Sequence, residues 1–411
     1  MVYAPVNHHV PFLNWTAVNF AANISDVNLF ELYYKGLFGG FNAYYYTLSL
    51  HDIIRDYAGT ETRDIRFFPI KLTNREYERF LSNLKATEDI PEPYLFFSNN
   101  CAHGIYQILY ESLDDLPTKP MRVMSPLSVV SILNTKNRLE NPFILYSAKT
   151  RILNYVDKER AELEFMEWQN QQGFFQFNID RNQRMSQLRI SLSQKDVGQP
   201  QMFVPDVPWT DPHKYSRLET GISYTERNIS TYFNYRPLLH DPSDNQHFYS
   251  GFSTIQLLSP TIVLQESKIY LRSVDILHLR STPIFDKWFR SISYDVFLGY
   301  DDRAYNASVG IGMSFYLSRK KSITMEFLLL DSLKNGVNFV GIETQILKNT
   351  TGKIRYGLSY EHLYKGFSSD MYLNLTSWMA FDISKNYGFY LENVLNNHEK
   401  GNTKAGVRYY F

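Results

Sequence analysis

The last ten residues of the chain, 402–411, alternate strictly between two kinds of side chain. The apolar or aromatic set is Ala405, Val407, Tyr409 and Phe411, and the cationic, small or polar set is Lys404, Gly406, Arg408 and Tyr410. A period of two places the two sets on opposite faces of a strand. Such a strand is typical of the closing strand of a transmembrane β-barrel, although an edge strand of a soluble sheet would alternate in the same way.

The same alternation recurs throughout the C-terminal half, in segments 218–224, 292–300, 309–317, 323–329, 340–346 and 354–360. One face is rich in Gly and Ser and the other is aromatic as well as aliphatic, and turn signals such as Lys334-Asn335-Gly336 separate the segments. About twelve segments follow Tyr215, each near the ~10 residues that a tilted membrane strand needs. An even number closes an antiparallel barrel without an edge in lipid. We therefore predict an all-β antiparallel transmembrane barrel of about 12 strands over residues 206–411.

The charges predicted to point into this barrel are Arg217, Glu219, Asp295, Glu326, Glu343, Arg355 and Arg408. They could line a lumen, but a polar network that fills a narrow barrel is the simpler interpretation.

Composition narrows the function classes. The 42 Lys and Arg residues balance 42 Asp and Glu residues, so no basic field exists to attract nucleic acid. The single cysteine excludes a disulfide framework within the chain. Met1 leads directly into Val2 without the charged and apolar parts of an export signal, yet a barrel must be exported. We therefore expect that the N-terminus is mature, truncated or mis-started.

The N-terminal part has a different, α+β pattern. Thr73 and Glu76 form a capping box before a helical apolar pattern, and residues 94–97 read as a short buried strand. Cys101 then falls in the first turn of a second helix, with Asn99 or Asn100 as its N-cap. At that position the helix dipole and the free N–H groups favour thiolate over thiol. The alternative is a small residue that fills space.

Four motifs in this part carry a resemblance: Asn19-Phe20-Ala21-Ala22, the Gly-rich segment 35–41, Arg63-Asp64 and the segment 96–101. Together they resemble the periplasmic domain of Lnb-type lipoprotein N-acyltransferases, which is similar to circularly permuted papain-like (NlpC-type) thiol enzymes. The C-terminal half resembles an outer-membrane barrel often fused to that domain, through segments 234–241 and 274–276. The resemblance implies a papain-like domain over 1–118, a helical connector over 119–205 and the barrel over 206–411. It also implies an outer-membrane location with the N-terminal domain in the periplasm.

In such enzymes a histidine on a strand precedes the cysteine, usually after a glycine. This chain has Asn7-His8-His9-Val10-Pro11, without the glycine and with a proline where the strand should run. His9 is therefore a candidate base beside His8, unless the true histidine lies upstream or both are merely exposed. The candidate catalytic set is Cys101 as nucleophile, His9 as base and Asn100 beside the Cys101 N–H as oxyanion donor. His103 should point to a different helix face and is expected to be structural.

Two functions follow. The first is a thiol acyltransferase or amidohydrolase that forms a thioester on lipid, lipoprotein or cell-wall substrates. Its expected partners are outer-membrane lipid and lipoproteins or phospholipid acyl donors. The barrel assembly machinery is a further expected partner, through the strand that ends at Phe411. No nucleic acid, metal or other cofactor is expected. The second is a non-enzymatic barrel, a channel or assembly factor, with a degenerate papain-like domain as plug or binding module.

Overall fold

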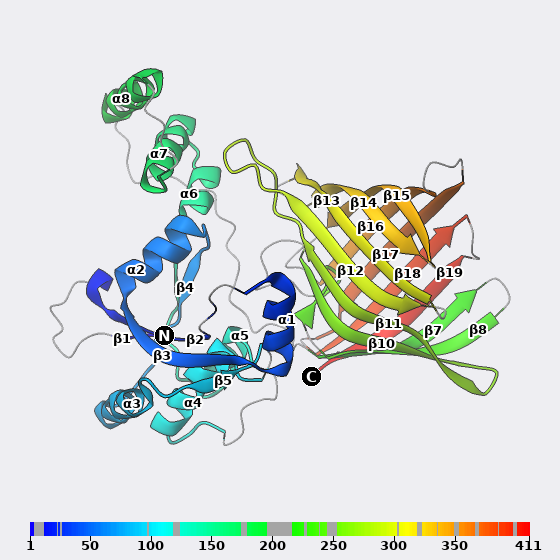
Figure 1. Ribbon diagram of the computed structural model, residues 1–411, viewed down its shortest axis with the longest axis horizontal. Coiled ribbons are helices and arrows are strands. Elements are labelled where there is room, and N and C mark those ends of the chain that lie inside the picture. The colour runs from blue at the N-terminus through cyan, green and yellow to red at the C-terminus, as the bar shows by residue number, and fades with distance from the viewer. Residues whose placement is uncertain are drawn as a thin grey trace. The chain divides into compact units, whose positions relative to one another are not determined.

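The computed structural model describes residues 1–3, 12–22, 24, 27–96, 98–117, 124–173, 179–194, 216–225, 228–237, 239–244, 253–301, 304–318, 323–334, 336–348, 353–365, 370–384, 386–397 and 401–411. The chain divides into two compact units, Met1–Pro205 and Asp206–Phe411 (Figure 1). No helix in these described ranges is long and apolar enough to cross a membrane.

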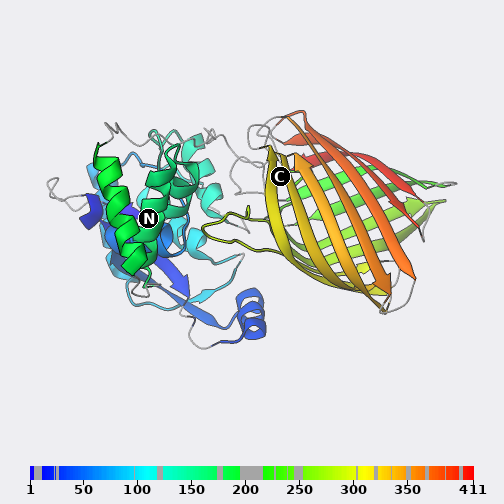
Figure 2. The ribbon, with the colours of Figure 1, turned by 90° about the horizontal axis from the view of Figure 1, so that it is seen from above.

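Twelve of the described strands of the second unit form one closed antiparallel ring (Figures 1 and 2). They are β7 (Arg217–Thr225), β8 (Asn228–Arg236), β10 (Thr254–Gln265), β11 (Lys268–Ser281), β12 (Ser293–Asp301), β13 (Ala304–Ser318), β14 (Ile323–Lys334), β15 (Val337–Lys348), β16 (Ile354–Lys365), β17 (Met371–Asp382), β18 (Tyr387–Asn396) and β19 (Asn402–Tyr410). Each strand pairs with the next, and β19 pairs with β7 to close the ring. A short β9 (Leu239–His240) adds to the start of β10. The predicted 12-strand barrel is confirmed.

The two faces of the barrel strands differ as the alternation predicts. On β13, for example, Val309 and Ile311 are 60% and 55% exposed. All of the predicted inward charges are buried: Arg217, Glu219, Asp295, Glu326, Glu343, Arg355 and Arg408. A continuous exposed band of aliphatic and aromatic side chains around a polar interior is the pattern of a barrel whose outer face contacts lipid.

The first unit is built around a four-stranded antiparallel sheet in the order β1 (Val2–Tyr3), β2 (Thr16–Ala22), β3 (Phe41–Ser49) and β5 (Glu92–Tyr94). Two of its helices, α3 (Asn74–Thr87) and α4 (Cys101–Ser112), pack together. Their apolar residues Phe80 and Ile108 share a buried core with Phe20 and Tyr45 of the sheet. The α+β architecture is confirmed, whereas the papain-like permutation stays a prediction.

The strand predicted over residues 94–97 was wrong in its bounds, because β5 ends at Tyr94. The backbone N–H and carbonyl groups of Leu95 instead bond those of Asn99. These bonds turn the chain back before the cysteine helix, so no strand can continue there.

The remaining helices of the first unit are α1 (Leu29–Phe38), α2 (Leu50–Ile54), α5 (Pro126–Thr135), α6 (Ala148–Asn154), α7 (Lys158–Gln171) and α8 (Ile179–Gln194). The predicted capping box of Thr73 and Glu76 is present. Ser125 and Asp157 are the N-caps of α5 and α7. Segment 180–194, compatible with helix or strand in the sequence, is helical.

The expected boundary at residue 118 stays a prediction, and several contacts cross it. Strand β4 (Ile65–Phe67) pairs with β6 (Phe143–Leu145), and the Arg138 guanidinium bonds the Glu76 carboxylate at 2.8 Å. The residues after 124 therefore pack on the earlier part of the unit.

Because the outer face of the barrel contacts lipid, a charge introduced there should destabilise the barrel more the closer it lies to the middle of the bilayer. Leu329, near the middle of β14, is 65% exposed, and Leu333, on the same face near its end, is 42% exposed. We expect Leu329→Arg to destabilise the barrel by about 2–4 kcal/mol and Leu333→Arg by about 1 kcal/mol or less. Urea unfolding in lipid vesicles measures both. Equal effects would contradict a membrane-facing surface.

Candidate functional site

Cys101 is the first residue of α4, and its position depends on Asn100. The Asn100 Oδ1 atom accepts hydrogen bonds from the N–H groups of Ala102 (3.0 Å) and His103 (3.1 Å). Its Nδ2 atom donates to the carbonyls of Phe96 (2.9 Å) and Met124 (2.8 Å). Asn100, one of the two caps that the sequence allowed, is therefore the N-cap. Because both of its amide hydrogens are engaged, its geometry is that of a residue that positions the helix start.

The Cys101 side chain is exposed to solvent. Nevertheless, the protein atoms around the sulfur displace enough water to raise the pKa of the Cys101 thiol. The backbone N–H groups of Ala102 and Cys101 at the helix start lower the pKa of the thiol, as does the positive charge of the Met1 amino group, but these effects are smaller than desolvation. The expected preference for thiolate is therefore not produced by the described surroundings, because desolvation outweighs the helix N–H groups.

Tyr94 lies beside Cys101 and closes one side of this site. Burial raises the pKa of Tyr94, the nearby Cys101 adds to the rise, and the Cys101 backbone N–H donates a hydrogen bond to the tyrosine oxygen. The N–H group that the sequence suggested for an oxyanion thus already has an acceptor. A substrate would have to displace the Tyr94 hydroxyl to use it. Sequence inspection did not single out Tyr94, since only the turn at Leu95 brings it back to the helix start.

The histidines divide into two groups. His8 and His9, the candidate bases, lie outside the described residues. His103 lies within the described residues. Burial lowers the pKa of His103, and the nearby Glu92 acts in the opposite direction. The Nδ1 atom of His103 is buried without a hydrogen-bond partner in the described part of the chain. No described imidazole contributes to the pKa of Cys101. The structural role expected for His103 stays a prediction.

Helix α1 adjoins the loop that precedes Cys101. The Phe96 N–H donates to the Gly36 carbonyl at 2.8 Å. A Cβ atom on Gly36 would lie 2.3 Å from the Phe96 ring, so only glycine allows this close approach. The Gly-rich segment noted in the sequence thus packs α1 against the cysteine loop. No phosphate-binding role is needed to explain it.

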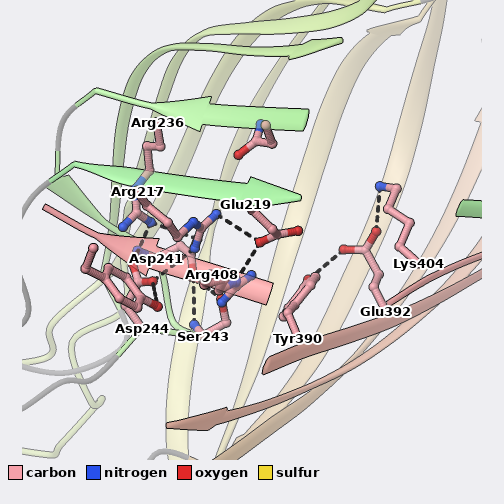
Figure 3. Close-up of polar contacts among 12 residues, drawn as sticks. Arg217, Glu219, Arg236, Asp241, Ser243, Asp244, Tyr390, Glu392, Lys404 and Arg408 are labelled. Carbon is pink, nitrogen blue, oxygen red and sulfur yellow. Dashed lines mark hydrogen bonds and ion pairs between the residues drawn. The ribbon is translucent and has the colours of Figure 1, made fainter. Parts of the chain in front are cut away.

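The barrel interior holds a second polar constellation, centred on the turn Asp241–Asp244 (Figure 3). The Arg217 Nη1 atom lies 2.8 Å from the Asp241 carboxylate and 3.0 Å from that of Asp244. The Arg236 Nη1 atom contacts the same two carboxylates at 2.9 and 2.5 Å. Both arginines and Asp244 are buried.

Two further arginines hold the backbone and hydroxyl of this turn. Arg355 donates from Nε to the Ser243 carbonyl at 3.0 Å, and Arg408 donates to the Ser243 Oγ at 2.6 Å. Arg408 also bonds Glu219 across the closing strand pair at 2.5 Å. Sequence reasoning found Arg217, Arg355 and Arg408 through strand alternation. It missed Arg236, Asp241 and Asp244; the segment 234–241, which contains the first two, was the available signal.

A second group of charges lies on other barrel strands. Arg280 bonds Glu326 at 2.5 Å and Glu343 at 3.1 Å, and His278 lies 3.0 Å from Asp295. Two interior cavities of about 350 and 600 Å³ share Ser273, Asp275, His278 and Arg280 in their lining. The charges predicted to point inward therefore have polar partners, and cavities remain beside them. Among the described residues, no group of three or more His, Cys, Asp or Glu side chains could hold a metal ion.

Comparison with known proteins gives matches for both units. Residues 7–135 match the Lnb N-terminal periplasmic domain, and residues 210–411 match a domain of unknown function, DUF7840. No curated protein sequence matches the chain.

Among solved structures the chain is similar to several outer-membrane proteins. The KdgM porin has 10% identity over 47% of this chain and 99% of the porin chain, with a TM-score of 0.32. The NanC porin has 6% identity over 48% of this chain and 99% of its own, with a TM-score of 0.33. Omp33, an outer membrane protein of Acinetobacter baumannii, has 10% identity over 48% of this chain and 99% of its own, with a TM-score of 0.29.

The interior ion pairs predict a large penalty for breaking one of them. Arg236→Ala leaves the buried carboxylates of Asp241 and Asp244 without one of their cations, so we expect a loss of about 3–5 kcal/mol in the free energy of unfolding. Lys334→Ala is the control, because its pair with Glu361 (3.0 Å) is more exposed, and it should cost about 1 kcal/mol or less. Urea unfolding in vesicles gives both values. A penalty for Arg236→Ala no greater than the control's would show that the turn is not held by charge.

Proposed function

Since the chain carries an Lnb N-terminal periplasmic domain joined to an outer-membrane β-barrel, we propose that it is a membrane-anchored thiol enzyme. Its periplasmic domain transfers or hydrolyses acyl groups through Cys101. The observation that carries this proposal is that Cys101 is an exposed residue at the first position of α4, where the nearby backbone N–H groups act to lower its pKa. A structural cysteine is usually buried among apolar side chains.

The reaction forms and breaks a thioester. His9, or His8 in its place, takes the proton of the Cys101 thiol, and the thiolate attacks the carbonyl carbon of an ester or amide. The bond to the leaving group breaks, the proton passes to the leaving oxygen or nitrogen, and the acyl group stays on sulfur. Water or an amine then attacks the thioester, releasing an acid or an amide and restoring the thiol.

The barrel serves this chemistry as an anchor. Its interior is occupied by paired charges from several strands, with the Asp241–Asp244 turn among them. The barrel keeps the catalytic domain close to outer-membrane phospholipid, the proposed acyl donor, and to lipoproteins, the proposed acceptor. In the amidohydrolase alternative, the substrate is a cell-wall amide. The strand that ends in the exposed Phe411 is the proposed recognition segment for the barrel assembly machinery.

A second candidate function is a non-enzymatic barrel, a channel or assembly factor, with an inactive periplasmic domain as plug or binding module. Two observations favour it. The described surroundings raise the pKa of Cys101, and two polar cavities lie inside the barrel.

Acylation of Cys101 decides between the two. The full chain in vesicles that contain a phospholipid with an alkyne-tagged acyl chain should acquire a tag that hydroxylamine removes, because hydroxylamine cleaves thioesters. With one cysteine in the chain, that tag belongs to Cys101. Cys101→Ala should abolish it and leave the gel mobility of the folded barrel unchanged. A chain that acquires no hydroxylamine-labile tag from either phospholipid or a lipopeptide donor would favour the non-enzymatic barrel.

The pH dependence of alkylation tests the base. An imidazolium beside the sulfur should bring the apparent pKa of Cys101 below the ordinary ~8.5 and so increase the thiolate fraction at neutral pH. His9→Ala should then raise that apparent pKa and slow iodoacetamide alkylation at pH 7, with His8→Ala as the matched control. The described groups alone shift the pKa of Cys101 in the opposite direction, upward. Without an imidazolium beside the sulfur, alkylation should therefore accelerate only at alkaline pH. That behaviour in all three proteins would remove His8 and His9 from the mechanism.

A further inference from the structure

Helix α1 exposes aromatic side chains at the edge of the first unit. Phe38 is 74% exposed and Tyr34 is 55% exposed, and their rings lie 5.3 Å apart. In both ribbon views α1 lies at the border of this unit, away from α7 and α8 (Figures 1 and 2). A pair of large aromatic rings in water is costly, and an apolar medium relieves that cost.

The two charged side chains of α1 neutralise each other, so they add little to the cost of placing the helix against an apolar medium. Its sequence, Leu-Phe-Glu-Leu-Tyr-Tyr-Lys-Gly-Leu-Phe, contains one acid and one base. Glu31 and Lys35 lie one turn apart and form an ion pair with each other. A helix with no net charge can therefore place exposed Phe and Tyr rings at a membrane interface without burying an unpaired charge.

Two features connect this helix to lipid and to the cysteine. The contact between Gly36 and Phe96 joins α1 to the loop before Cys101. The segment 195–215 joins the first unit to a barrel embedded in the membrane and, at no more than ~3.5 Å per residue, spans at most roughly 70 Å. The first unit is therefore tethered to a barrel that lies in a phospholipid bilayer.

We propose that α1 docks in the periplasmic leaflet of the outer membrane through Tyr34 and Phe38, and thereby presents the Cys101 site to phospholipid acyl chains. The occupant of the exposed face is the interface between lipid headgroups and acyl chains. This inference rests on the proposed acyl chemistry for its purpose, but the docking itself requires no reaction.

The test uses the full chain in phosphatidylcholine vesicles. In a Cys101→Ala background, the fluorophore NBD is attached at Phe38→Cys or, as matched control, at Val156→Cys. Val156 is 64% exposed and lies between α6 and α7. A doxyl-labelled phosphatidylcholine with its quencher high on the acyl chain should quench the label at position 38 several-fold more than the label at 156, since interfacial helices lie ~5–10 Å deep. Equal quenching at the two positions, or none at 38, overturns the proposal.

A second measurement separates docking from chemistry. In a chain with Cys101 intact, Phe38→Asp should lower phospholipid-dependent acylation of Cys101 roughly tenfold, the cost of losing one buried aromatic ring. Val156→Asp should leave acylation unchanged, and iodoacetamide should label Cys101 equally in both variants. Quenching at position 38 without any acylation supports docking and refutes the acyl chemistry. Acylation that Phe38→Asp leaves unchanged refutes the presentation of Cys101 by α1.

Discussion

The hydrocarbon core of a bilayer contains no water to hydrogen-bond a free backbone group, and the architecture of the second unit follows from that constraint. Every strand must pair on both sides, so a sheet in lipid has to close. The pairing of β19 with β7 provides the closure, in a register that places Arg408 opposite Glu219. An even number of strands with sequential antiparallel pairing returns the last strand to the first.

Closure concentrates charges. Side chains at alternate positions of every strand point into one narrow interior, where an unpaired charge would be expensive. The interior is therefore arranged as matched pairs around Arg280 and around the Asp241–Asp244 turn. The turn is not a strand. Its carboxylates accept hydrogen bonds from Arg217 and Arg236, and Ser243 accepts from Arg355 and Arg408. The same pairing that stabilises the barrel leaves cavities of about 350 and 600 Å³ in its interior.

In the first unit, the start of helix α4 determines where the candidate site lies. Asn100 ties α4 to the chain segments around Phe96 and Met124, and this fixes where Cys101 stands. Opposing effects then act on the sulfur: neighbouring atoms exclude water and favour the thiol, while backbone N–H groups and the positive charge of the Met1 amino group favour the thiolate. In the described surroundings desolvation is the largest of these effects, so the pKa of Cys101 is raised.

Local patterns in the sequence determined the elements of this protein. The alternation around Tyr409 and Arg408 assigned each residue to an outer or inner face, and the capping box at Thr73 marked a helix start, because faces and caps depend only on near neighbours. Tertiary structure decided the rest. Arg408 and Glu219 are 189 residues apart and meet only through barrel closure, and β5 ends early because Asn99 folds back on Leu95. The direction of the Cys101 pKa shift depends on how closely other atoms crowd the sulfur, and no local pattern encodes that.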